Sequence, residues 1–207
     1  MPSTMIHLFI ADNLKDDLKV CDCGQFYLGA ISPDAVNIFG KASKELRYSA
    51  HLRSADYNEW IDNISRFVKD NKDLSEKDSD FFKGFVVHLI TDIAWDQTAQ
   101  PVLFDKMLAK GVSKDELNFA KWDELCGFDN NAVELELWTK VIKPSLKAAS
   151  IKQSYTVDKE LLIKTHSFVV NEGFVNKAAS TTSLITNDML NAASDRAYEL
   201  IKTISFN

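Results

Sequence analysis

The stretch FVVHLITDIAWD, residues 85–96, decides the fold of this chain of 207 residues. Apolar side chains fall on every side of the helix that these residues would form. A helix that is apolar all round is normally covered by other helices, so we expect a central buried helix over about residues 80–95. Two polar residues interrupt it, His88 and Asp92. They are four residues apart and therefore project from one face.

This polar pair has two interpretations. An isolated buried carboxylate is costly and needs a partner. The partner of Asp92 could be His88 itself, or a tyrosine or arginine elsewhere, through a hydrogen bond. It could instead be a metal ion that both residues bind from adjacent helical turns. The spacing alone leaves both interpretations open.

The remainder of the chain favours an all-α fold in one domain, residues 1–207. Glycine and proline are few, 7 and 4 residues, and no segment alternates cleanly between apolar and polar residues. Residues 20–31 are interpreted as a loop, Ser32-Pro33-Asp34 as a helix start, residues 70–80 as a charged loop, and Pro144 as a kink or helix end. Besides the central helix, we expect helices over about residues 3–14, 56–69, 99–109, 114–125, 130–149, 158–171 and 187–204.

Composition restricts the classes of partner. The net charge of −6 and the pI of about 5.2 argue against a general attraction to duplex nucleic acid or anionic membranes. No apolar run is long enough for a transmembrane helix, and the N-terminus lacks the features of a secretory signal. The three cysteines are odd in number, and Cys21 and Cys23 lie closer together than usual zinc-binding pairs. We therefore expect reduced thiols and a cytoplasmic location.

Other residues strengthen the metal interpretation. His7 lies within the apolar run MIHLFIA, His51 begins the block HLR, and Asp34 stands at the expected helix start. Zinc in hydrolytic sites takes histidine nitrogen and carboxylate oxygen and keeps a position for water. Ordinary alternatives remain for single residues: a core histidine at position 7, and a carboxylate favoured by the helix dipole at position 34.

Four blocks in order carry a family resemblance: HLFIA (7–11), FYLGAISPDAV (26–36), HLR (51–53) and FFKGFVVHLITDIAWD (81–96). Together they resemble the zinc-dependent phospholipase C and P1 nuclease-like family, most closely its uncharacterised bacterial members. The resemblance implies an all-α multi-helix bundle. It also implies a cluster of up to three zinc ions that hydrolyses phosphodiester bonds.

The resemblance assigns roles to five residues. Asp34, His51, His88 and Asp92 would be the ligands of one metal. Asp92 would also bridge to a second metal that His7 helps to bind. Asp34 matches the family aspartate that orients or deprotonates the attacking water.

The family's third metal has fewer counterparts here. It uses two further histidines and a glutamate, whereas only His166 follows Asp92 and no glutamate stands four residues after it. In secreted members the N-terminal amine also ligates a metal, and here six residues precede His7. The resemblance therefore predicts one or two zinc ions.

The resulting expectation is a metal-dependent hydrolase of small-molecule or lipid phosphodiesters, such as phospholipids or nucleotides, that uses metal-activated water. The alternative is a non-catalytic helical metal-binding or interaction protein on the same scaffold, because ligands of the third metal are missing. The oligomeric state is left open.

Five neighbouring residues have less specific roles. We expect Arg53 to pair with a core carboxylate rather than with a phosphate. Asp96 and Asp123 are expected to be solvated acids rather than pocket residues. Trp95 is expected in the core rather than against a substrate. His166 is expected to be a core or surface residue rather than a ligand.

Overall fold

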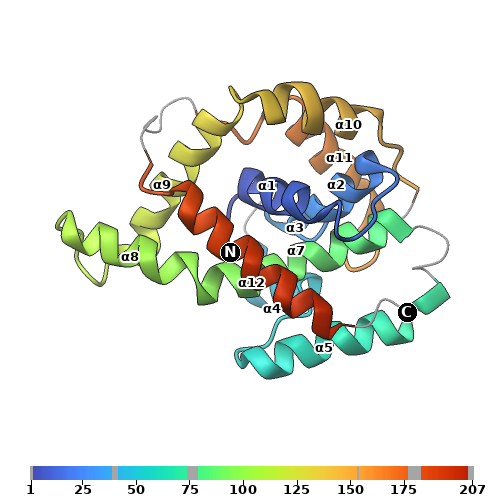
Figure 1. The fold of residues 1–207 in the computed structure, drawn as a ribbon, viewed down its shortest axis with the longest axis horizontal. Coiled ribbons are helices and arrows are strands. Elements are labelled where there is room, and N and C mark those ends of the chain that lie inside the picture. The colour runs from blue at the N-terminus through green and yellow to red at the C-terminus, as the bar shows by residue number, and fades with distance from the viewer. Residues whose placement is uncertain (1, 39–41, 74–78, 153, 177–182, 205–207) are drawn as a thin grey trace.

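The structure is a computed structural model that describes residues 2–38, 42–73, 79–152, 154–176 and 183–204. All regular elements in these ranges are helical, and none is a strand, which confirms the all-α prediction (Figure 1). No helix of the described ranges is both long enough and apolar enough to cross a membrane. The prediction of a single domain stays a prediction.

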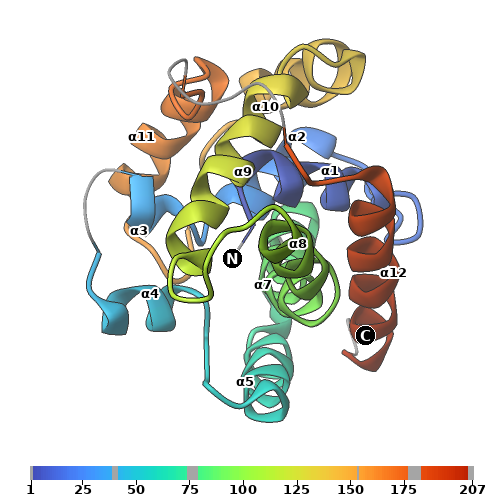
Figure 2. The ribbon, with the colours of Figure 1, turned by 90° about the vertical axis from the view of Figure 1, so that its left-hand side faces the viewer.

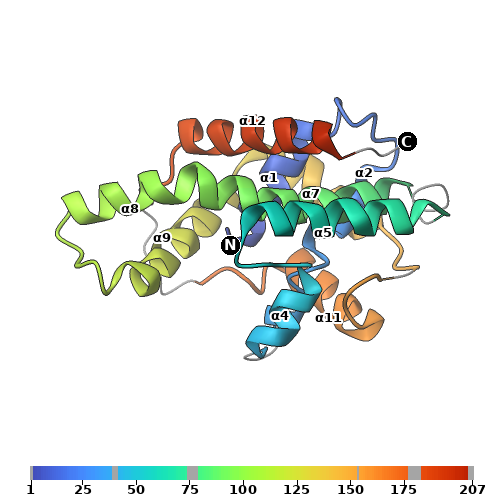
Figure 3. The same cartoon turned by 90° about the horizontal axis from the view of Figure 1, so that it is seen from below.

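Helix α7 (Ser79–Gln97) lies at the centre, as residues 85–96 predicted. Every residue from Phe81 to Trp95 except Lys83 is buried. Around α7 pack α1 (Thr4–Leu14), α2 (Cys23–Ile31), α5 (Tyr57–Asp70), α8 (Ala99–Ala109) and α12 (Asn187–Thr203). Figure 3 shows α12 and α5 running alongside α7. The apolar residues on all sides of α7 thus meet several different helices.

The remaining helices flank this centre. Short α3 (Ala35–Ile38) contacts α4 (Lys44–Ala50) and α11 (Lys159–Val170). Helix α9 (Leu117–Ala132) packs on α1 and α8, and Figure 2 shows it rising past α8. A π-helix, η1 (Leu137–Ile142), leads directly into α10 (Lys143–Ala148), which packs on α2.

The prediction of a loop over residues 20–31 was wrong, because most of this segment is α2. The Asp22 side chain caps the helix by accepting a hydrogen bond from the backbone N–H of Gln25 at 3.1 Å. Helix α2 then packs very closely on α7 at two glycines. A Cβ at Gly29 would lie 2.1 Å from the Phe81 carbonyl oxygen, and one at Gly84 would lie 1.9 Å from that of Phe26. The two backbones therefore meet where side chains are absent.

Several element boundaries also differ from the predictions. Helix α3 begins at Ala35, so Asp34 precedes it, and α9 runs through the expected break near residue 125 to Ala132. The prediction of a helix end at Pro144 was wrong, because the chain stays helical from η1 directly into α10. Pro144 lies in the first turn of α10, directly after the π-helix, where a missing backbone N–H is tolerated. Of the predicted loop 70–80, residues 74–78 lie outside the described ranges.

Candidate metal centre

The structure brings the five predicted ligand residues into one buried cluster. They come from four segments: His7 from α1, Asp34 from the turn before α3, His51 from the end of α4, and His88 and Asp92 both from α7. The shortest distance joins His51 Nε2 to Asp34 Oδ1, at 3.2 Å. His7 Nε2 lies 3.6 Å from Asp92 Oδ1, and His51 Nε2 lies 3.8 Å from Asp92 Oδ2.

The backbone fixes two of the imidazole rings. His88 Nδ1 lies 2.7 Å from the carbonyl oxygen of Ala30, and His51 Nδ1 lies 2.8 Å from that of Arg47. A carbonyl oxygen only accepts, so each Nδ1 carries a proton and donates it. Both rings therefore turn Nε2 toward the cluster. Histidines that ligate metals are normally held in this way through their other nitrogen.

The end of α4 holds His51 and Arg53 in place through a Schellman turn. The Arg53 N–H donates to the Tyr48 carbonyl oxygen at 2.8 Å, and the Leu52 N–H donates to that of Ser49 at 3.2 Å. Leu52 adopts φ 49°, in the left-handed region that favours glycine. The Trp60 indole N–H also donates to the His51 carbonyl oxygen, at 2.9 Å. Strain of this kind is often retained where it positions functional side chains.

Several buried polar atoms of the cluster have no hydrogen-bond partner among the described residues. They are both carboxylate oxygens of Asp92, both ring nitrogens of His7, and Nε2 of His88. The structure therefore shows no hydrogen bond between His88 and Asp92, and none to Asp92 from a tyrosine or arginine. Leaving a buried carboxylate unpaired is strongly unfavourable. A bound cation or additional protons would be needed to neutralise the unpaired carboxylate of Asp92.

The pKa values in the cluster follow from burial and mutual charge. Burial lowers the pKa of His7 and of His88, whose rings stack at 3.7 Å. Burial also raises the pKa of Asp92. At His51, burial is outweighed by the hydrogen bond to Asp34 and by the charges of Asp92 and Asp34, so its pKa is raised. At Asp34, burial is outweighed by the three histidines, and its pKa is lowered.

This donor set fits zinc. Imidazole nitrogens and carboxylate oxygens converge in two overlapping groups: His7, His88 and Asp92, and Asp34, His51 and His88. The ligand atoms within each group lie within 4.8 Å of one another. Imidazole–carboxylate sets of this kind are typical zinc ligands. A cation at this place would give the unpaired atoms of Asp92 and His88 their partner.

The two groups suit one or two ions. An imidazole nitrogen binds a single metal, so His88 Nε2 serves only one of them. A carboxylate can bridge, and the two oxygens of Asp92 face different histidines, Oδ1 toward His7 and Oδ2 toward His51. Asp92 would be able to hold an ion together with His7 and His88.

Access to the cluster is restricted. Asp34 is the one member with a partly exposed side chain, 16%, while the other four are almost fully buried. The space beside His7 and Asp34 is narrow and is lined by Thr4, Ala30, Ile31 and Val169. Reactants would therefore have to approach Asp34 first.

The neighbouring residues divide into confirmed and corrected predictions. Arg53 pairs with a core carboxylate as predicted, at 3.1 Å from Asp96, and Trp95 is buried. The prediction of a solvated Asp96 was wrong, because this residue lies one turn after Asp92 and its side chain is only 5% exposed. Asp123 is exposed. His166 Nε2 bonds to the Leu146 carbonyl oxygen at 2.7 Å, away from the cluster.

One residue that supports the site was missed by the sequence reasoning. The Asp129 carboxylate on α9 accepts hydrogen bonds from Ser3 Oγ at 2.6 Å and from the Met5 backbone N–H at 3.3 Å. It thereby anchors the first turn of α1, one turn before His7. Burial raises the pKa of Asp129 to about 7. A sequence separation of more than 120 residues leaves no local pattern that could reveal this contact.

Asp129→Asn is expected to remove a pH dependence of stability. Between about pH 4 and 7 the folded state keeps a proton that the unfolded state has released, so the free energy of unfolding falls as pH rises. The asparagine variant should lose this fall, which amounts to about 4 kcal/mol over the whole range and about 3 kcal/mol between pH 5 and pH 8. Urea unfolding with chelator at pH 5 and pH 8 measures it. The exposed Asp123→Asn serves as control, and equal slopes for Asp129→Asn and wild type would contradict the assignment.

Comparisons of the chain with protein-family models, with curated proteins and with solved structures find no match.

Proposed function

We propose that this protein is a metal-dependent hydrolase of phosphodiester bonds that uses zinc, with a scaffold of the phospholipase C and P1 nuclease type. The observation that carries the proposal is the convergence of His7, His51, His88 and two aspartates around the unpaired carboxylate of Asp92. Small-molecule phosphodiesters, such as phospholipids or nucleotides, are the proposed substrates. Zinc in such a site acidifies water and stabilises negative charge on phosphoryl oxygens.

The proposed roles of the cluster residues follow from how deeply each is buried. His7, His51, His88 and Asp92 are buried and would hold the metal in a dry setting, where electrostatic interactions are strong. Asp34 is the member that solvent reaches. Its lowered pKa keeps it ionised at neutral pH. Asp34 can therefore accept a hydrogen bond from the attacking water and orient it.

Asp34→Asn tests this division of roles. Asparagine keeps the shape of the side chain but cannot take a proton, and positioned bases contribute roughly 10²–10⁴-fold to rate. We expect turnover of a chromogenic phosphodiester to fall by about that factor when zinc is saturating. The Asp123→Asn variant should retain full activity. Wild-type activity in Asp34→Asn would contradict the assigned role.

A second candidate function is a non-catalytic metal-binding protein on the same scaffold. It is favoured by the narrow space beside His7 and Asp34 and by the burial of the other four members of the cluster. The same phosphodiester assay separates the two functions. Turnover that requires zinc and stops with chelator excludes the second candidate. Zinc-loaded protein without turnover excludes the first.

A further inference from the structure

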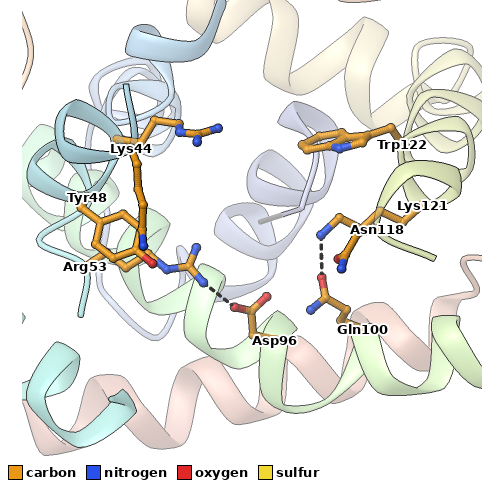
Figure 4. Close-up of a pocket in the computed structure, with 9 residues that line it drawn as sticks. Lys44, Tyr48, Arg53, Asp96, Gln100, Asn118, Lys121 and Trp122 are labelled. Carbon is orange, nitrogen blue, oxygen red and sulfur yellow. Dashed lines mark hydrogen bonds and ion pairs between the residues drawn. The ribbon is translucent and has the colours of Figure 1, made fainter. Parts of the chain in front are cut away.

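A basic pocket lies between α4 and α9, beside the metal centre. It is a cavity of about 370 Å³, lined by four cations and two aromatic residues: Lys44, Arg47, Tyr48, Arg53, Lys121 and Trp122. Figure 4 shows Lys44, Tyr48 and Arg53 on one wall, Lys121 and Trp122 on the other, and Asp96 with Gln100 between them. Its size falls within the range of small-molecule sites, about 300–1,000 Å³.

The pocket is positive in a protein whose net charge is −6. Within it, Arg53 is neutralised by Asp96 at 3.1 Å, and Lys121 donates to the Gln100 side-chain oxygen at 3.2 Å. Lys44 and Arg47 are exposed and form no ion pair with any residue in the described ranges. Three cations therefore remain without a carboxylate partner on facing walls. A concave site with charge of one sign attracts a small ion of the other sign.

Each of the two aromatic residues of the pocket has a lysine over its ring, but the two differ in exposure. The ring of Tyr48 has Lys44 Nζ at 5.0 Å and the Arg53 guanidinium carbon at 5.7 Å. These contacts hold two of the cations along one wall. Trp122 on the opposite wall has Lys121 Nζ at 5.7 Å from its ring centroid and is half exposed, at 50%. A half-exposed indole offers a surface on which a flat ring can stack.

Three links connect this pocket to the metal centre. The Arg47 carbonyl oxygen accepts the hydrogen bond that orients His51. Arg53 follows His51 by two residues within the Schellman turn. Asp96 on the pocket floor lies one helical turn after Asp92 on α7. A ligand in the pocket would therefore lie next to the cluster without touching its ligand residues.

We propose that the basic pocket binds a terminal phosphate, distinct from the phosphodiester that is cut. The flat ring of the same ligand would stack on Trp122. The preferred substrates would then be phosphodiesters that carry a second, terminal phosphate and an aromatic ring. The assignment of this ligand as substrate rests on the proposed hydrolase function. The binding itself requires only the pocket.

The test is a calorimetric titration of the full chain in chelator with three probes: 5′-AMP, adenosine and inorganic phosphate. We expect 5′-AMP to bind on the order of tenfold more tightly than either fragment, because it engages both the cations and the indole. Lys44→Gln should weaken both 5′-AMP and phosphate. Trp122→Ala should weaken 5′-AMP on the order of tenfold and leave phosphate unchanged.

The control variant is Lys164→Gln, which removes an exposed lysine of α11 outside the pocket. It should bind all three probes as wild type does. Equal affinities for 5′-AMP and adenosine, or no change in Lys44→Gln, would overturn the phosphate anchor. Binding to phosphatidic acid vesicles without binding of 5′-AMP would overturn the ring assignment in favour of a lipid phosphate.

The outcome is separable from that of the proposed function. Tight binding of 5′-AMP in chelator, with no phosphodiester turnover in zinc, would reject the hydrolase and keep the pocket. Zinc-dependent turnover without binding of 5′-AMP would keep the hydrolase and reject the pocket.

Discussion

Asp92→Asn is expected to remove most of the zinc affinity and yet to stabilise the metal-free protein. The loss of affinity should exceed about 100-fold, since removing a group that only orients a ligand already costs about 10–100-fold. The metal-free protein should gain about 1–3 kcal/mol, because a buried carboxylate without a hydrogen bond is replaced by a neutral amide. A residue with a purely structural role would give the opposite sign of stability change.

The gain in stability should also depend on pH. Burial raises the pKa of Asp92, so the metal-free wild type loses stability as pH rises above the ordinary range of aspartate. The asparagine variant has no such loss, and its advantage is therefore expected to be larger at pH 8 than at pH 5. Zinc titration against a competing chelator and urea unfolding in chelator measure the two effects. Asp123→Asn should change neither, and unaltered zinc binding by Asp92→Asn would refute the assignment.

Gly84→Ala is expected to cost about 3 kcal/mol or more of stability. Its Cβ would lie 1.9 Å from the Phe26 carbonyl oxygen and 2.9 Å from the Phe26 carbonyl carbon, and both atoms belong to the backbone of α2. Relief requires that α2 and α7 separate, which is at the upper end of overpacking costs. The gain of about 0.5–1 kcal/mol from alanine in a helix is too small to compensate.

The same separation should reach the metal centre. Gly84 lies one turn before His88, and the Ala30 carbonyl oxygen that orients His88 follows the partner glycine, Gly29. Zinc affinity is therefore expected to fall together with stability. Gly111→Ala is the control. Nothing lies within 4 Å of its Cβ position, and its φ of 90° predicts a loss of about 1–2 kcal/mol with unchanged zinc binding. Wild-type stability of Gly84→Ala would contradict this description of the interface.

The central helix and the members of the cluster were predictable because their signal is local. A helix that is apolar on all sides has to be buried by other helices. A histidine or aspartate within such a helix is then buried too and needs a hydrogen-bond or metal partner. His7, His88 and Asp92 all have this signal. It indicates which residues need partners, but not that His51 and Asp34 would face Asp92 from other helices. That expectation came from the family resemblance. The structure shows that these side chains lie close together.

Other features depend on distant contacts and left no local signal. Residues 20–31 were interpreted as a loop, whereas most of them form α2, in which Gly29 permits close packing on Gly84 of α7. The Asp129 contact joins α9 to the start of α1, across more than 120 residues of sequence. The basic pocket combines lysines and arginines from α4 and α9, which form no charge run in the sequence. Tertiary packing creates each of these features.

Elemental analysis of the purified protein shows whether the buried cluster binds zinc. We expect one or two zinc ions per chain in the wild type and their loss in His88→Ala, with the helical content of both proteins unchanged. A folded wild-type protein that contains no metal and takes up none from added zinc would contradict this expectation.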